Sequence, residues 1–275
     1  MKIWEALIYG LVAGLTGLLP VSFSGHAAVL QDAFALSPLT QGGGLYVRAA
    51  ITLGLSAALV LAFPGELQLT CGELPRRPQR GKRARQPSPR RRAVLMGLLA
   101  LPIGLLSLIW CAAAERITRL SLIAAFFCLN GLILFAAGRP GGQKDARALM
   151  LPDALLAGAT RLAAVLPGLS PLGLTLAVCR LRDLRTDFAL RFTAMLALGF
   201  SLCEFVYRLL RAVIVGTFSA SLWLPMLVAL VASTVAGYFA LQYLKYLLHR
   251  EKLRVFSYYC WDAAVIALIL ALINA

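Results

Sequence analysis

Long runs of apolar residues, separated by short polar segments, fill most of this sequence. A helix needs roughly 20 apolar residues to cross the hydrocarbon core of a bilayer, and several of the runs reach that length. We therefore predict six transmembrane helices. Their expected ranges are 45–63, 94–114, 120–138, 188–216, 222–244 and 255–273.

Two further apolar stretches, 3–36 and 151–179, are each interrupted midway by Leu-Pro followed by serine and glycine. Proline and glycine break helices, and each broken half is too short to span a bilayer. A broken backbone at membrane depth is tolerated only where protein or a polar cavity surrounds it. We therefore predict two re-entrant helical hairpins, with LPVSFSGH (19–26) at the tip of the first.

The composition agrees with a membrane protein, because 60% of the 275 residues are hydrophobic and only 14% are charged. A soluble domain of this size could not bury so much apolar surface. We expect the bilayer as a partner, no nucleic acid, and no cleaved signal peptide, since no small-residue cleavage site follows the first apolar run. The six scattered cysteines show no metal-ligand spacing, so we interpret them as small core residues and expect no metal site from them.

Positive charge predicts the orientation. Residues 64–92 carry nine Lys and Arg against two Glu, and short basic loops stay in the cytoplasm. Counting spans from the basic loop 64–93, we expect the basic segments 139–150, 180–185 and 245–254 on the same side, provided that 151–179 dips into the membrane and returns. An alternative role for the basic loop is binding of anionic lipid headgroups.

The two hairpins then face opposite ways, which predicts an inverted repeat. Leu19-Pro20 recurs as Leu166-Pro167, and Ser22-x-x-Gly25 recurs as Ser170-x-x-Gly173, at an offset near 148. Broken helices that meet in an inverted repeat are typical of a site for a charged or polar substrate. The alternative is that proline and glycine only permit close packing. We expect one integral membrane domain, 1–275, made of repeats at about 1–138 and 139–275.

The hairpin tips carry candidate chemistry. Helix N-termini offer free backbone N–H groups, and Ser22, Ser24, Ser170 and Thr175 add hydroxyl groups beside them. Such tips suit an anion, above all phosphate. Because the surrounding helices are apolar, the expected ligand is an amphiphile with a phosphorylated head. His26 would lie beside that head and suits proton transfer or attack on phosphorus; its alternative role is a hydrogen-bonded structural group.

The chain resembles the undecaprenyl-diphosphate phosphatases of the BacA/UppP type. The resemblance lies in GLTGLLPVSFSGH (14–26), AAITLGLSAALVLAF (49–63), DALLAGATRLAAVLPGLSPLGLT (153–175) and, more weakly, VFSYYCWDAAVIALIL (255–270). It implies six spanning helices with two inverted hairpins, a polyprenyl diphosphate or phosphate as lipid substrate, a place in the bacterial inner membrane and a role in cell-wall synthesis. It also implies a divalent cation, magnesium or calcium, as cofactor, and it leaves a homodimer open.

This chain departs from the resembled family at positions where the family carries charged residues. The family has two glutamates where this chain has Ala13 and Gly17, and an arginine where it has Pro171. A catalytic group of this kind commonly accelerates a reaction by a factor on the order of 10² to 10⁴. Arg161 is the best substitute for the arginine, followed by Glu204 and Arg191. For Glu204 the alternative is an ion pair with Arg208, four residues further along the helix.

Two hypotheses follow. The first is an enzyme, a divergent polyprenyl-diphosphate phosphatase. The second is a non-catalytic binder or transporter of a polyprenyl phosphate, in effect a flippase or a pseudoenzyme. The expected catalytic residues are His26 and Ser22, and the expected phosphate-binding residues are Ser24, Gly25, Ser170, Gly173, Thr175 and Arg161.

Overall fold

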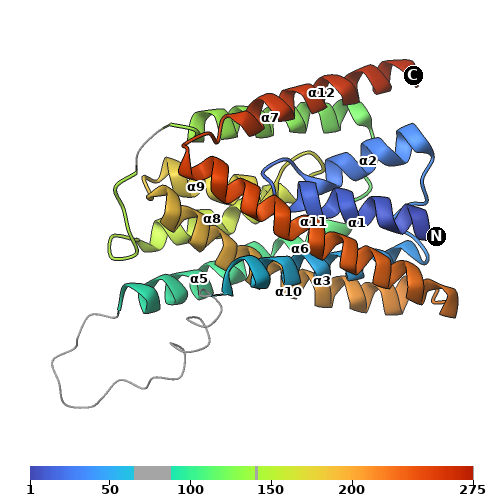
Figure 1. Cartoon of the computed structure of the whole chain (residues 1–275), viewed down its shortest axis with the longest axis horizontal. Coiled ribbons are helices and arrows are strands. Elements are labelled where there is room, and N and C mark those ends of the chain that lie inside the picture. Colours follow the sequence, from blue (N-terminus) through green and yellow to red (C-terminus); the bar gives the residue numbers. More distant parts are fainter. Residues whose placement is uncertain (65–87, 140–141, 275) are drawn as a thin grey trace, which may run out of the picture.

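The computed structural model describes residues 1–64, 88–139 and 142–274. In these ranges the chain is built from helices, and no β-strand is present beyond an isolated bridge between Lys144 and Leu184. The helices run mostly along the long axis of the molecule, and the N- and C-termini lie at the same end (Figure 1). The fold is therefore the all-α class that the apolar pattern predicts.

Five of the described helices are long and apolar enough to cross a membrane. A sixth span is formed by two helices that meet at a bend of 42°, and Pro102 lies inside the first of them. A proline removes a backbone donor and kinks a helix. The six predicted spans are thus confirmed. They are α3 (Gly44–Ala62), α5 (Pro89–Leu105) with α6 (Ser107–Ala114), α7 (Leu120–Ala137), α10 (Thr186–Val215), η1 (Ala220–Leu222) with α11 (Trp223–His249), and α12 (Val255–Ile273).

Two broken helices complete the fold. The first comprises α1 (Ile3–Gly17) and α2 (Phe23–Phe34), and the second comprises α8 (Leu151–Ala164) and α9 (Pro171–Leu181). None of the four helices exceeds 15 residues, too few for a full span. The first hairpin opens toward the end of the molecule that holds the termini, and the second opens toward the other end (Figure 1).

The two breaks meet in the interior, where Asn130 of α7 joins them. Its amide Nδ2 donates to the carbonyl oxygen of Pro20 at 3.0 Å, and its Oδ1 accepts from the backbone N–H of Ser170 at 3.0 Å. Asn130 and Ser170 are fully buried. One side chain therefore satisfies a backbone group of each break.

Glycine lets the two breaks approach this closely. A Cβ on Gly25 would lie 2.5 Å from the ring of Phe127 and 2.9 Å from the backbone nitrogen of Gly168. A Cβ on Gly173 would lie 2.8 Å from Pro20. Each hairpin thus has a glycine where the other hairpin's break presses against it.

The predicted basic segments 139–150, 180–185 and 245–254 lie together at one end of the molecule. Arg180 donates to the carbonyl oxygen of Arg139 at 2.6 Å and pairs with Glu251 at 2.9 Å. Arg92, at the start of α5, donates to the carbonyl oxygen of Leu149 at 3.0 Å. These contacts agree with the expectation that the segments share one side of the membrane, and their cytoplasmic placement stays a prediction. Most of the predicted basic loop 64–93 lies outside the described residues.

The prediction that the cysteines are small core residues is confirmed for some of them and wrong for one. Cys111, Cys179 and Cys260 are buried and Cys203 is half-buried, as small core residues would be. Cys128 is exposed, so its interpretation as a core residue is wrong. It lies on the outer face of α7, where an apolar pattern cannot distinguish a surface that faces lipid from one that faces protein. Cys71 lies outside the described residues.

Replacing Asn130 with leucine should strongly destabilise the protein. The substitution leaves the N–H of Ser170 and the C=O of Pro20 buried without this partner. Each unsatisfied group costs about 1–3 kcal/mol, so we expect a loss on the order of 2–6 kcal/mol. The measurement is the thermal unfolding midpoint of the purified protein in one detergent.

The matched control is Thr193→Val, which also removes a buried polar group without changing side-chain volume much. Thr193 is fully buried, and within the described ranges its hydroxyl makes one long hydrogen bond, of 3.9 Å, to Cys179 Sγ. A midpoint for Asn130→Leu equal to that of Thr193→Val would show that the bridge contributes little.

Candidate functional site

A cavity of about 190 Å³ lies next to the two breaks. Its wall combines apolar residues of several helices with five charged side chains, so the helices around the tips are less uniformly apolar than the sequence predicts. The charged residues that line it are Arg48 of α3, Glu115 at the end of α6, Arg161 of α8, and Glu204 and Arg208 of α10.

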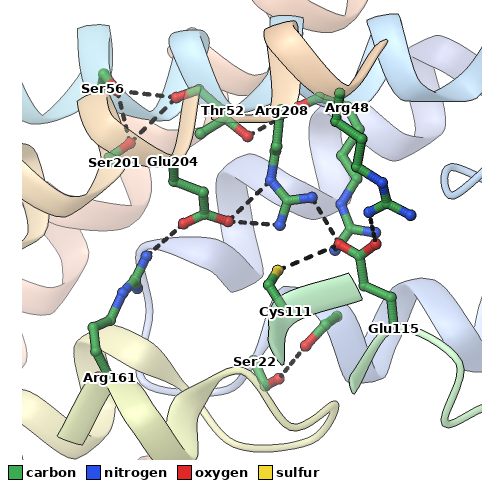
Figure 2. Close-up of polar contacts among 12 residues, drawn as sticks. Ser22, Arg48, Thr52, Ser56, Cys111, Glu115, Arg161, Ser201, Glu204 and Arg208 are labelled. Atoms are coloured by element: carbon green, nitrogen blue, oxygen red, sulfur yellow. Dashed lines mark hydrogen bonds and ion pairs between the residues drawn. The ribbon is translucent and has the colours of Figure 1, made fainter. Parts of the chain in front are cut away.

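Glu204 is held by two arginines from different helices. Its Oε1 accepts from Arg208 Nη2 at 2.6 Å and from Arg208 Nε at 3.0 Å, and its Oε2 pairs with Arg161 Nη2 (Figure 2). The expected ion pair between Glu204 and Arg208 is therefore present. Arg161, the expected substitute for the missing arginine, joins the same carboxylate.

Glu115 is the second carboxylate and is held by three arginines. Its Oε1 accepts from Arg208 at 2.8 Å and pairs with Arg48 at 3.1 Å (Figure 2). Its Oε2 pairs with Arg211. Three guanidinium groups around one carboxylate favour its ionised form.

We call these six residues the arginine–glutamate cluster: Arg48, Glu115, Arg161, Glu204, Arg208 and Arg211. Four guanidinium charges face two carboxylate charges, which leaves a net charge of +2. Opposite charges attract more strongly in a protein interior than in water, and uncompensated charge there is costly. The cavity is therefore suited to an anionic ligand.

Three of the predicted phosphate-binding residues line the cavity: Ser24, Thr175 and Arg161. The Thr175 hydroxyl lies 2.8 Å from the Thr160 hydroxyl, and the Ser24 hydroxyl lies 3.3 Å from that of Ser22. The structure thus brings the arginine and two hydroxyl groups to one cavity. Their role toward phosphate stays a prediction.

Ser22 and Ser170, with Gly25 and Gly173, lie in the crossing of the two breaks. Each serine caps its own helix, Ser22 accepting from Gly25 N at 3.5 Å and Ser170 from Gly173 N at 3.1 Å. Each also reaches the other hairpin. Ser22 Oγ accepts from Gly168 N at 3.1 Å, and Ser170 Oγ donates to the carbonyl oxygen of Leu19 at 3.2 Å. These groups already have partners within the protein.

His26 points away from the cavity and toward α12. Its Nδ1 lies 2.6 Å from the carbonyl oxygen of Ser22 and its Nε2 lies 2.9 Å from the Tyr259 hydroxyl. A carbonyl only accepts, so Nδ1 carries the proton and Nε2 accepts from Tyr259. The imidazole ring also packs against the Phe127 ring in a T-shaped arrangement, with the two ring centroids 5.1 Å apart. The catalytic role of His26 stays a prediction, and this arrangement matches its structural alternative.

Sequence reasoning missed Arg48, Glu115 and Arg211. All three lie near an end of a predicted span, where a charged residue is ordinarily assigned to the membrane surface. Only folding shows that Arg48 and Arg211 converge on one carboxylate. Arg191, the weaker candidate, is not among the residues that line the cavity.

The residues present do not fit a divalent cation. Magnesium and calcium require carboxylate and other oxygen ligands, and among residues 1–64, 88–139 and 142–274 no group of three or more His, Cys, Asp or Glu could hold a metal ion. Both oxygens of Glu115 and of Glu204 already face guanidinium groups.

These features define a polytopic membrane protein with a charged cavity beside two broken helices. The chain belongs to the bacitracin resistance protein BacA family, whose model matches residues 6–266. The chain is 30% identical to an undecaprenyl-diphosphatase of Methanobrevibacter smithii, covering 97% of this chain and 96% of the relative. It is 31% identical to an undecaprenyl-diphosphatase of Carboxydothermus hydrogenoformans, covering 98% of each.

The predicted membership is confirmed, and two of the departures fall at the cavity. Gly17 and Pro171, at the positions where the resemblance implies a glutamate and an arginine, both line it. Ala13, at the other glutamate position, is fully buried and is not in the lining. The charges of this cavity therefore come from α3, α6, α8 and α10 rather than from the two breaks.

Replacing Arg208 with methionine should destabilise the protein more than replacing Arg161 with methionine. Arg208 bonds both buried carboxylates, whereas Arg161 pairs with one. A hydrogen bond to a charged group contributes about 1.5–3 kcal/mol. Arg208→Met removes such bonds from two carboxylates, each of which keeps another arginine, whereas Arg161→Met removes them from one. We therefore expect the larger loss of stability for Arg208→Met, measured as thermal unfolding midpoints.

The control for this comparison is Arg147→Met, which removes an exposed arginine from the loop before α8. Exposed charges contribute little, so its midpoint should stay near that of the wild type. Equal midpoints for Arg208→Met and Arg147→Met would contradict a stabilising contribution from the Arg208 bonds.

Proposed function

We propose that this protein binds a polyprenyl diphosphate or phosphate of bacterial cell-envelope synthesis, with the anionic head in the cavity. The observation that carries the proposal is the net charge of +2 on the arginine–glutamate cluster, beside two helix breaks in a membrane protein. The names of the relatives, undecaprenyl-diphosphatase, support a lipid diphosphate as the ligand class.

Arg48 and Arg161 are the arginines that we propose for the first contacts with the head. A guanidinium group has five N–H donors in a planar fork that matches phosphate oxygens. Arg161 uses Nη2 for Glu204, and Arg48 uses Nη2 for Glu115, so most of their donors remain for a ligand. Leu55, Leu59 and Phe200 in the same lining offer apolar contact to the first part of a prenyl chain.

The first candidate activity is hydrolysis of the diphosphate, with release of phosphate. Membership of the BacA family and the relatives' names support it. For this chemistry we propose His26 as the base or nucleophile and Ser22 as its neighbour, with Arg161 neutralising charge on the transferred group. His26 would then have to exchange its bond with Tyr259 for one with the substrate.

The second candidate is a binder or transporter that holds the lipid without cleaving it. A specific observation favours it, because His26 bonds Ser22 and Tyr259 outside the cavity while both cavity carboxylates are held by arginines. No side chain with these partners is ready to activate water. The fold is compatible with both candidates, since function depends on the site.

For the cellular setting, we propose the bacterial inner membrane, with the basic end in the cytoplasm, in keeping with the positive-inside rule. We also propose that the chain is a single membrane domain of two inverted repeats. The matched caps at Ser22 and Ser170 support the repeat. A homodimer remains open to measurement by light scattering in detergent.

Replacing Arg161 with alanine should weaken binding of farnesyl diphosphate, a short polyprenyl diphosphate, by about tenfold or more. Hydrogen bonds to charged groups are worth about 1.5–3 kcal/mol, which is the origin of that factor. Isothermal titration of the purified protein in detergent measures it. Arg147→Ala is the matched control and should bind as the wild type does. Unchanged affinity in Arg161→Ala would contradict the proposed head site.

Phosphate release from undecaprenyl diphosphate separates the two candidates. If the protein is an enzyme by way of His26, the wild type releases phosphate and His26→Ala loses about 10²-fold or more of that rate. The control is His249→Ala, which removes the second histidine, exposed at the basic end. Binding without release in the wild type would instead establish the binder.

A further inference from the structure

We propose that the cavity binds its anionic head without a divalent cation, because guanidinium groups of the arginine–glutamate cluster supply the counter-charge. This inference rests on the proposed function and specifies the chemistry of the same site. It departs from the resemblance in the sequence, which implies that a divalent cation takes part in binding.

The oxygen atoms that a cation would need are already taken. Glu115 and Glu204 are the carboxylates among the described residues that line the cavity. Each of their four oxygens contacts at least one guanidinium nitrogen at 3.1 Å or less. A cation would have to displace those groups and would add two positive charges to a cluster that already has an excess of two.

The arginines can provide what the cation would otherwise provide, namely neutralisation of the phosphate oxygens and a fixed geometry. Arg161 lies over the ring of Phe200, with its guanidinium carbon 5.3 Å from the ring centroid, and this contact holds the planar group in place. Arg208 contacts both carboxylates, so one guanidinium group already spans two anionic centres (Figure 2). A diphosphate also presents two anionic centres close together.

Glu204 then has a definite part, that of an internal counter-anion. Its carboxylate occupies Arg161 in the absence of ligand, and an entering phosphate group competes with it for the same guanidinium. A carboxylate that acts this way opposes binding of the anion. A carboxylate that held a metal would favour binding, so the two roles predict opposite effects of removing its charge.

The first test compares affinities of the wild type for farnesyl diphosphate in EDTA and in excess magnesium, by isothermal titration, with calcium as a second cation. We expect the two dissociation constants to agree within about threefold. A loss of affinity of tenfold or more in EDTA would overturn the inference and leave the proposed function standing. Absence of binding under both conditions would overturn the proposed function as well.

The second test uses Glu204→Gln, which keeps the side-chain shape and removes the charge. We expect tighter binding of farnesyl diphosphate, by about tenfold, because a negative charge next to the ligand is gone. Weaker binding together with a loss of any magnesium effect would identify Glu204 as a metal ligand and overturn the inference. Unchanged affinity would show that Glu204 does not compete with the ligand for Arg161. It would overturn the role of Glu204 as an internal counter-anion.

Glu115→Gln is the second variant, in case the first does not fold, and circular dichroism checks the helix content of both. A third comparison is Arg161→Lys, which keeps the charge but not the planar fork. We expect it to bind more weakly than the wild type, in EDTA and in magnesium alike. Restoration of its affinity by magnesium alone would overturn the inference, since a cation could then take the place of the fork.

Discussion

The fold depends on closing the hydrogen bonds of two broken helices inside the membrane. A break exposes backbone N–H and C=O groups, and no water is present at that depth to satisfy them. Asn130 satisfies one group of each break, and Ser22 and Ser170 each bond to the opposite hairpin. Without these bonds, neither hairpin tip could remain in the interior. Their mutual contact is therefore a condition for the cavity beside them.

This arrangement has a consequence for the chemistry of the site. The N–H and hydroxyl groups at the tips look like anion-binding groups in the sequence, but Ser22 and Ser170 use theirs to hold the hairpins together. The cavity therefore takes its charge from the helices that surround the tips, through Arg161, Arg208 and Arg48. The two breaks determine the shape of the cavity, and the arginines determine that its net charge is positive.

Sequence patterns predict the fold well, because length and hydropathy alone limit what can cross a bilayer. All six spans and both hairpins follow from apolar runs and from Leu-Pro breaks, and Arg161 stands out as a charge within an apolar segment. Two other features could not be predicted. Arg48 and Glu115 look like charges at span ends until folding joins them. The direction of His26 depends on the rotation of α2, because a side chain on a twelve-residue helix can face the cavity or α12.

The cluster also carries an energetic argument for a ligand. Buried ion pairs contribute little net stability, since desolvation offsets their attraction, and unpaired buried charge costs several kcal/mol. A cluster with two more guanidinium groups than carboxylates is thus an expensive feature to keep for stability alone. An anion that binds the excess charge would offset part of this electrostatic free energy. Its binding would also raise the unfolding midpoint in proportion to the logarithm of the anion concentration. The energetic cost of the excess charge supports the proposal that an anion from outside the chain binds at the cluster.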